Sequence, residues 1–152
     1  MTTLVARDSW VGAVVAAKER GLVMFDFLTA VDHEADGFEL VLHLWDPKDR
    51  VGALLTTRTP RDDASFPTIT AEFGGAAWHE RAVAELFGIR FDGHDTEPLL
   101  LAPTFEGHPL RKEFLLAPRL EKRWPGAKEP GESDADVAAS TRRRLLPPGV
   151  PR

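Results

Sequence analysis

The sequence contains no cysteine and no tyrosine among its 152 residues. Without cysteine the chain has no disulfide, no thiol nucleophile and no cysteine ligand for zinc or an iron–sulfur cluster. No apolar run approaches the roughly 20 residues that cross a bilayer. Arg7 and Asp8 also lie where a signal peptide needs its apolar core. We therefore expect a cytosolic or peripheral protein whose function depends on histidines, carboxylates and bases, or on binding alone.

Charge is divided unevenly along the chain. Residues 118–152 contain eight Lys or Arg and five Asp or Glu, whereas residues 1–117 contain eleven and nineteen. Six of the twelve prolines also lie in residues 118–152. These patterns predict an acidic folded domain over residues 1–117 and an extended, proline-rich charged tail over residues 118–152. The acidic domain argues against nucleic acid as the partner, because phosphate contacts need a basic surface.

Apolar residues at helical spacing predict two helices, one over Asp8–Arg20 and one over about Ala76–Phe87. Asp8 or Ser9 can cap the first helix, and the second ends before Gly88. In the second helix we expect the apolar stripe to include Trp78 and Phe87, both in the core.

Three further segments alternate between apolar and polar residues, as half-buried strands do. They are Val23–Val31, Phe38–Trp45 and Val51–Thr59. The residues expected on one face of the first strand are Val23, Phe25, Phe27 and Val31. The links between the three strands are short, and a parallel crossover needs a dozen or more residues, so the strands should form an antiparallel meander.

Between and after these elements the sequence predicts loops. Arg58–Pro67 is polar and contains two prolines, Thr68–Phe73 fits a helical turn, and Ile89–Leu116 is rich in proline and glycine. The predicted fold class is therefore α+β, with a small antiparallel sheet, helices packed on one face and an extended C-terminal tail.

Histidines are the first candidates for chemistry. Two Gly-His pairs, at 93–94 and 107–108, lie fourteen residues apart beside carboxylates. A stand-alone hydrolase or metal enzyme would use His79, His94 and His108. The alternative is that each glycine turns the chain and each histidine bonds to nearby backbone groups. His79-Glu80 does not form a zinc-protease helix, because valine occupies the position of the second histidine.

Charged residues on the second helix leave two interpretations open. Glu80, Arg81 and Glu85 lie off the expected apolar stripe and either form a solvated face or bond to the following loop or to a partner. An intrahelical ion pair among them contributes only about 0.2–0.5 kcal/mol. Arg111 and Lys112 are either solvated or ion-pair partners of Glu80 and Glu85.

Two segments resemble a known family. They are residues 78–94, WHERAVAELFGIRFDGH, and residues 105–114, FEGHPLRKEF. Together they resemble the thirty-kilodalton subunit of respiratory complex I, which is the C subunit of bacterial NADH-quinone oxidoreductase. The resemblance extends over about residues 20–130. This chain departs from the family pattern at Ala82, which replaces a glutamate, and at residues 95–101, DTEPLLL, which replace a basic run.

The resemblance implies a peripheral-arm subunit of a proton-translocating complex that uses FMN, iron–sulfur clusters, NADH and quinone, none of them bound by this chain. It implies contact with the D subunit, which holds the quinone site, with subunits B and I nearby, on the cytoplasmic side of the cell membrane and without a span. An equivalent scaffold subunit of a membrane-bound hydrogenase-like complex is the alternative. The residues implied to be structural or at partner interfaces, and not catalytic, are Glu80, Arg81, Glu85, Gly88, His94, His108, Pro109, Arg111 and Lys112.

Overall fold

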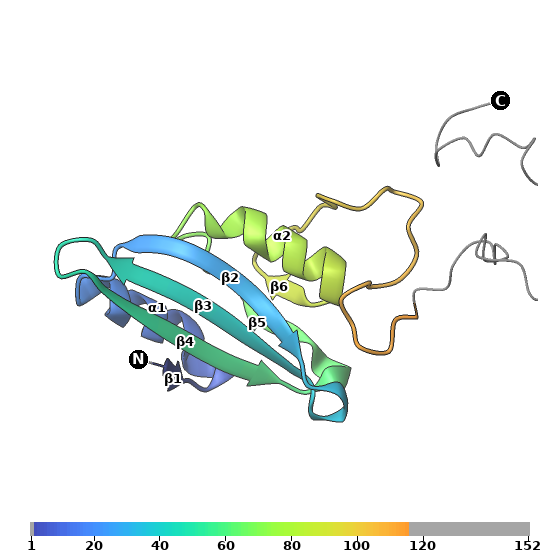
Figure 1. Cartoon of the computed structure of the whole chain (residues 1–152), viewed down its shortest axis with the longest axis horizontal. Helices are drawn as coiled ribbons and strands as arrows, with labels where there is room; N and C mark the ends of the chain where they lie inside the picture. The colour runs from blue at the N-terminus through green and yellow to red at the C-terminus, as the bar shows by residue number, and fades with distance from the viewer. Residues whose placement is uncertain (1, 116–152) are drawn as a thin grey trace, which may run out of the picture. The chain divides into compact units, whose positions relative to one another are not determined.

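The computed structural model describes residues 2–115, which form a four-stranded mixed sheet, two α-helices and a separate pair of short strands (Figure 1). In chain order the elements are β1 (Thr2–Leu4), α1 (Trp10–Glu19), β2 (Met24–Asp32), β3 (Phe38–Asp46), β4 (Val51–Thr59), β5 (Ser65–Pro67), α2 (Ala76–Phe87) and β6 (Arg90–Asp92). This arrangement confirms the α+β class. The predicted tail over residues 118–152 lies outside the described residues.

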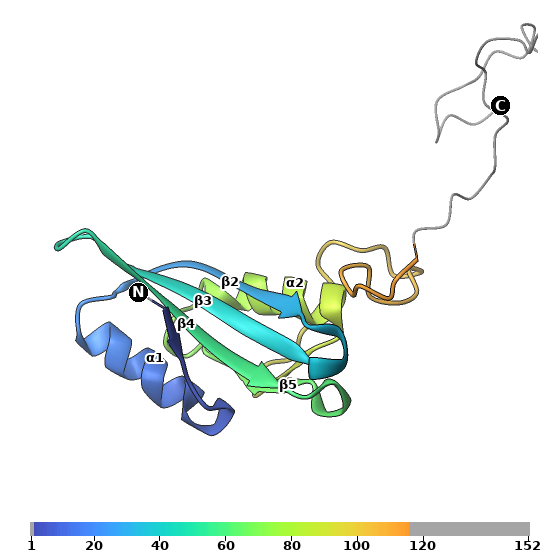
Figure 2. The same ribbon diagram turned by 60° about the horizontal axis from the view of Figure 1, so that its bottom comes forward.

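The main sheet has the strand order β1-β4-β3-β2. Strands β2, β3 and β4 pair antiparallel and confirm the predicted meander. Strand β1 adds to the outer edge of β4 in parallel, with Thr3 opposite Leu55, so the sheet is mixed and not purely antiparallel (Figure 2). The sequence did not predict β1, because three exposed residues are too few to show an alternating pattern of apolar and polar side chains.

A second, two-stranded sheet forms from segments that were predicted as loops. Strands β5 and β6 pair in parallel, with Phe66 opposite Phe91, and both phenylalanines are buried. The prediction that Arg58–Pro67 and Ile89–Leu116 are entirely loop is therefore wrong at these three-residue stretches. Thr68–Phe73 does contain the expected helical turn, since the amide of Phe73 donates to the carbonyl of Ile69 at 3.0 Å.

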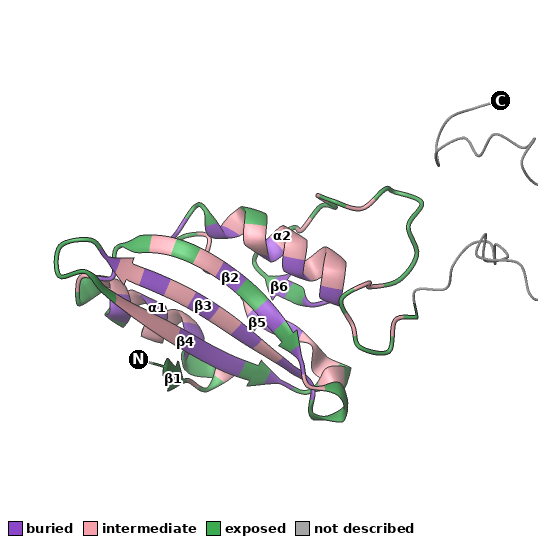
Figure 3. Ribbon diagram, viewed as in Figure 1, coloured by how far each residue is buried: buried purple, intermediate pink, exposed green. Residues whose placement is uncertain are grey.

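The hydrophobic core lies between one face of the main sheet and the two helices. Residues of β3 alternate between buried and half-buried along the strand, as Figure 3 shows. The fully buried side chains of β3 are Phe38, Leu40, Leu42 and Leu44. Trp10 and Val14 of α1 and Val83 and Phe87 of α2 belong to the same buried cluster. Helices on one face of the sheet are therefore confirmed.

Strand β2 departs from the predicted alternation because of a β-bulge. The register shifts between Phe25 and Phe27, so that Phe25 lies opposite Leu44 of the core face and Phe27 lies opposite His43 of the other face. Leu28 and Ala30 are the buried apolar residues that follow the bulge, while Val31 is exposed. The prediction that Phe25, Phe27 and Val31 share a face is wrong for this reason.

Helix α2 also presents a different face to the core than its apolar stripe predicts. Its buried residues are Ala76, Glu80, Val83 and Phe87, spaced as one side of a helix. Trp78 is 60% exposed, so its predicted place in the core is wrong, whereas that of Phe87 is confirmed. The predicted apolar stripe lies on the wrong side of α2 because a glutamate, Glu80, occupies a core-facing position.

No helix within residues 2–115 is both long enough and apolar enough to cross a membrane. Helix α1 begins two residues later than predicted, after a 3₁₀ turn over Arg7–Ser9. Ser9 occupies its N-cap position without a capping hydrogen bond from its side chain.

Two tryptophans test this description of the core. Trp10→Ala removes a fully buried side chain and should reduce the free energy of unfolding by about 3–5 kcal/mol. Trp78→Ala removes an exposed ring whose nearby partner is the Arg81 guanidinium, 5.4 Å from the ring centroid, and should cost only about 0.5–1 kcal/mol. Urea unfolding of both variants measures the difference, and equal losses would contradict the orientation of α2.

Candidate interaction site around helix α2

Glu80 is the most buried charged side chain of the described residues and connects three parts of the chain. Its side chain is 0% exposed. Its Oε2 atom accepts hydrogen bonds from Thr68 Oγ1 and His94 Nδ1, both at 2.7 Å, and Oε1 accepts one from the amide of Ile69 at 2.9 Å. A buried carboxylate is tolerated only when such donors replace water. Glu80 therefore fixes the turn before α2 and the loop after β6 to the helix.

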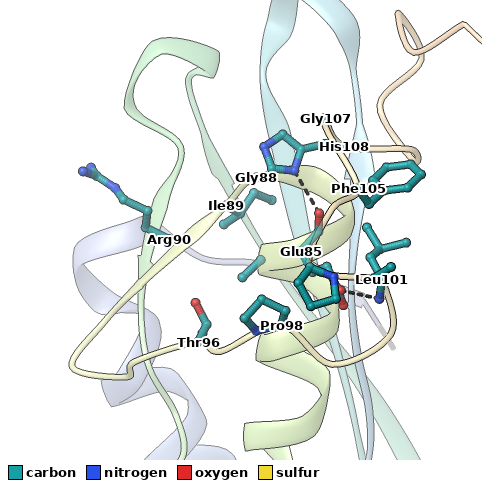
Figure 4. Close-up of a pocket in the computed structure, with 13 residues that line it drawn as sticks. Glu85, Gly88, Ile89, Arg90, Thr96, Pro98, Leu101, Phe105, Gly107 and His108 are labelled. Atoms are coloured by element: carbon teal, nitrogen blue, oxygen red, sulfur yellow. Dashed lines mark hydrogen bonds between the residues drawn. The ribbon is translucent and has the colours of Figure 1, made fainter.

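Glu85, one turn and a half further along α2, holds the next part of the loop. Its carboxylate accepts hydrogen bonds from the amides of Leu99 at 3.2 Å and Leu100 at 2.8 Å. It also accepts one from the amide of Leu101, which Figure 4 shows. Burial raises the pKa of the Glu85 carboxyl group, but these amides outweigh burial and hold the pKa below its ordinary value of 4.5. The contribution of Glu85 to the stability of the folded chain is complete above pH 4.5. It is lost as the pH falls through the lowered pKa.

Arg81 bonds to the same loop between these two carboxylates. Its Nε donates to the carbonyl of Glu97 at 2.8 Å, and its Nη2 donates to the carbonyl of Pro98 at 2.9 Å. The three charged residues that lay off the predicted stripe thus bond to the loop, and they do not form a freely solvated face.

The last turn of α2 is capped by the segment around the second Gly-His pair. The carbonyl of Glu85 accepts from His108 Nδ1 at 2.8 Å, that of Leu86 from the amide of Leu110 at 3.1 Å, and that of Phe87 from Arg111 Nε at 2.6 Å. Helix C-termini leave such carbonyls without partners inside the helix. Pro109 stands between two of the donors, so the motif HPLR acts as a C-terminal cap.

Gly88 ends the helix in a left-handed conformation, with φ +70°, that allows this cap to approach. A Cβ atom at this position would lie 2.4 Å from both His108 Nε2 and Arg111 Nη2. Glycine is therefore required here by both conformation and space.

Asp32, at the end of β2, forms a second anchor for residues 111–114. Its carboxylate accepts from the amides of Lys112 at 2.9 Å and Glu34 at 2.8 Å and from Arg61 Nη1 at 2.8 Å. Burial raises the pKa of Asp32, but these three donors outweigh burial and hold it below 3.8. Arg61 also pairs with Glu113. Reasoning from the residue chemistry of the sequence missed both Asp32 and Arg61.

The alternative that Arg111 and Lys112 pair with Glu80 and Glu85 is wrong. Arg111 binds a helix carbonyl, and Lys112 Nζ lies 3.3 Å from Glu34. The reason is that Glu80 already bonds to Ile69 and His94 and Glu85 to the amides of residues 99–101, while the amide of Lys112 bonds to Asp32 at the end of the sheet.

The histidines bond to separate partners. His79 Nδ1 lies 3.1 Å from the carbonyl of Leu28, whereas His94 binds Glu80 and His108 binds the carbonyl of Glu85. Among residues 2–115 no three potential metal ligands of the His, Asp and Glu types come together. The preceding glycines have φ angles of +91° and +90°, which fits the interpretation that they turn the chain.

A hollow of about 440 Å³ lies between the second half of α2 and the loop (Figure 4). Its lining is mostly apolar and includes Ile89, Pro98, Leu101 and Phe105. Glu85 and the Nδ1 atom of His108 also line it, but both already bond to backbone groups. The hollow is therefore mainly a shaped apolar surface.

The cap predicts a difference between two glycines. Gly88→Ala places a side chain in a left-handed conformation and against His108 and Arg111, and should lower the free energy of unfolding by at least about 1–2 kcal/mol. Gly74→Ala is the control, because a Cβ there meets nothing within 4 Å. Thermal unfolding compares the two, and a stable Gly88→Ala variant would contradict the cap.

Two known proteins with similar sequences are subunits of NADH-quinone oxidoreductases. The C 2 subunit of NADH-quinone oxidoreductase from Rhizobium meliloti (strain 1021) is 36% identical over 130 residues, which cover 81% of this chain and 71% of that protein. The C/D subunit of NADH-quinone oxidoreductase from Methylococcus capsulatus (strain ATCC 33009 / NCIMB 11132 / Bath) is 39% identical over 101 residues, 60% of this chain and only 17% of that longer protein.

A solved structure shares both fold and sequence with this chain. It is a chain of the membrane-bound sulfane sulfur reductase, an archaeal respiratory membrane complex. The two chains are 28% identical with a TM-score of 0.74, and the match covers 84% of this chain and 82% of that one. The family model for the respiratory-chain NADH dehydrogenase, 30 Kd subunit, matches residues 3–119, and the chain belongs to this family.

Proposed function

We propose that this chain is a non-catalytic subunit of the peripheral arm of a proton-translocating NADH:quinone oxidoreductase. It holds the quinone-site subunit, named D, beside the iron–sulfur subunits B and I, on the cytoplasmic side of the membrane. The observation that carries the proposal is the relative named as a C/D subunit, because its name joins the two subunits in one protein. Because that relative joins the two subunits in one protein, the simplest role for this chain is to bind the quinone-site subunit permanently.

The chemistry of the described residues supports a scaffold role without a bound redox cofactor. The sequence has no cysteine to ligate an iron–sulfur cluster. Glu80, Glu85 and Asp32 are each held by two or more hydrogen bonds to their own chain. Carboxylates held in this way fix the neighbouring backbone in place, which suits a structural role.

A second candidate is the equivalent scaffold subunit of a membrane-bound hydrogenase-like complex. It is favoured by the match to the membrane-bound sulfane sulfur reductase, which covers more than four-fifths of both chains. The two candidates differ in the electron donor and acceptor of the complex. Genes encoding NADH-binding subunits beside this one would favour the first, and genes encoding hydrogenase-type subunits would favour the second.

Co-purification with the quinone-site subunit tests the proposal. The tagged full-length chain, co-expressed with the quinone-site subunit from the same genome, should purify with it in equal amounts and should not oxidise NADH alone. An unrelated tagged protein with the same net charge is the control. Failure of the two proteins to co-purify, with both of them folded, would refute the scaffold role.

The same assay tests the predicted tail. The proposal extends to residues 118–152, which would run across the quinone-site subunit. A chain ending at residue 117 should then retain less of that subunit than the full chain. Unchanged retention would remove the tail from the proposed interface and leave the rest of the proposal intact.

A further inference from the structure

Three large apolar side chains are exposed on α2 and on residues 95–106 of the loop that it anchors. Trp78 is 60% exposed, Leu100 is 65% exposed and Phe105 is 39% exposed. Single exposed apolar residues are common on protein surfaces, but tryptophan is enriched among the residues that dominate protein interfaces.

Trp78 and Phe105 each line a hollow beside α2. A hollow of about 370 Å³ is lined by Trp78, Arg81, Asp95 and Glu97, among others, and the larger one of about 440 Å³ is lined by Pro98 and Phe105. Arg81 donates to the carbonyls of Glu97 and Pro98, one residue from each hollow, so the two lie on either side of this contact. We name Trp78, Asp95, Glu97, Leu100 and Phe105 the α2–loop surface.

The α2–loop surface is acidic. Between residues 92 and 106 the sequence has four Asp or Glu and no Lys or Arg. All four carboxylates, Asp92, Asp95, Glu97 and Glu106, belong to exposed residues. Two guanidinium groups lie nearby, that of Arg81, which bonds to two neutral carbonyls and keeps its charge, and that of Arg90, which lines the larger hollow and points away from it in Figure 4. The four carboxylates outnumber these two cations. The potential over this surface therefore favours a basic partner.

The surface is also fixed before any partner binds. Glu85 holds the amides of residues 99–101, Arg81 holds the carbonyls of residues 97 and 98, and Glu80 holds His94. An ordered loop loses little conformational entropy on binding, so contacts with its apolar side chains contribute more fully to affinity.

We infer that the α2–loop surface docks a segment of a partner protein that inserts apolar side chains beside Trp78 and Phe105 and places lysine or arginine against Asp95 and Glu97. Charge complementarity and the exposed aromatic residues carry this inference. It rests on the proposed function for the identity of the partner, which is then the quinone-site subunit.

Binding of the purified quinone-site subunit to the immobilised full-length chain, measured by biolayer interferometry at low and high salt, tests the inference. Trp78→Ala and the double variant Asp95→Lys/Glu97→Lys should each weaken binding by about ten-fold or more. The double variant should also lose most of the salt dependence of the association rate. The controls are Val51→Ala and Asp49→Lys/Asp62→Lys, which change exposed residues elsewhere and should bind like the wild type.

The outcomes separate the two proposals. If the wild-type chain binds and the surface variants bind equally well, the docking surface is refuted and the proposed function stands. If the folded wild-type chain does not bind the quinone-site subunit, both are refuted. Light scattering of the chain alone tests whether a second copy of the chain covers the α2–loop surface instead. If the wild-type chain is a dimer and the Trp78→Ala variant is a monomer, the inference is overturned.

Discussion

The structure around α2 depends on one constraint, which is that the loop after β6 must satisfy its backbone polar groups without regular secondary structure. From His94 to Phe114 the described chain forms only turns and bends. Helix α2 supplies many of the missing partners: Glu85 accepts from the amides of residues 99–101, and Arg81 donates to the carbonyls of Glu97 and Pro98. The carbonyl of Leu86 accepts from the amide of Leu110. The loop therefore has a defined shape because the helix is polar on the side that faces it.

This constraint explains why charged residues that suggest chemistry serve as structure here. A buried carboxylate normally prompts a search for a catalytic role. Glu80 instead accepts three hydrogen bonds from groups before and after the helix, and Asp32 does the same at the end of the sheet. The anchored loop presents exposed apolar and acidic side chains, which suits the subunit family to which the chain belongs.

Long alternating or periodic segments were predictable from the sequence, and short or polar ones were not. Strand β3 follows strict alternation and was predicted almost to the residue, whereas β1, β5 and β6 are three residues long and leave no periodic signal. The bulge in β2 and the burial of Glu80 in α2 each change which side chains face the core. Apolar patterning alone therefore assigns the core-facing side of both elements wrongly. The partners of Glu80 and Glu85 were not predictable, because they are mostly backbone amides, which every sequence contains.

Amide hydrogen exchange of a Glu85→Gln variant tests the central claim that α2 fixes the loop. The account predicts that the amides of Leu99, Leu100 and Leu101 exchange about ten-fold faster or more, while the Ile69 amide held by Glu80 is unchanged. Glu72→Gln, which alters a carboxylate paired with Lys18 outside the loop, should leave all four amides unaffected. Unchanged exchange at residues 99–101 in the Glu85→Gln variant would contradict the account.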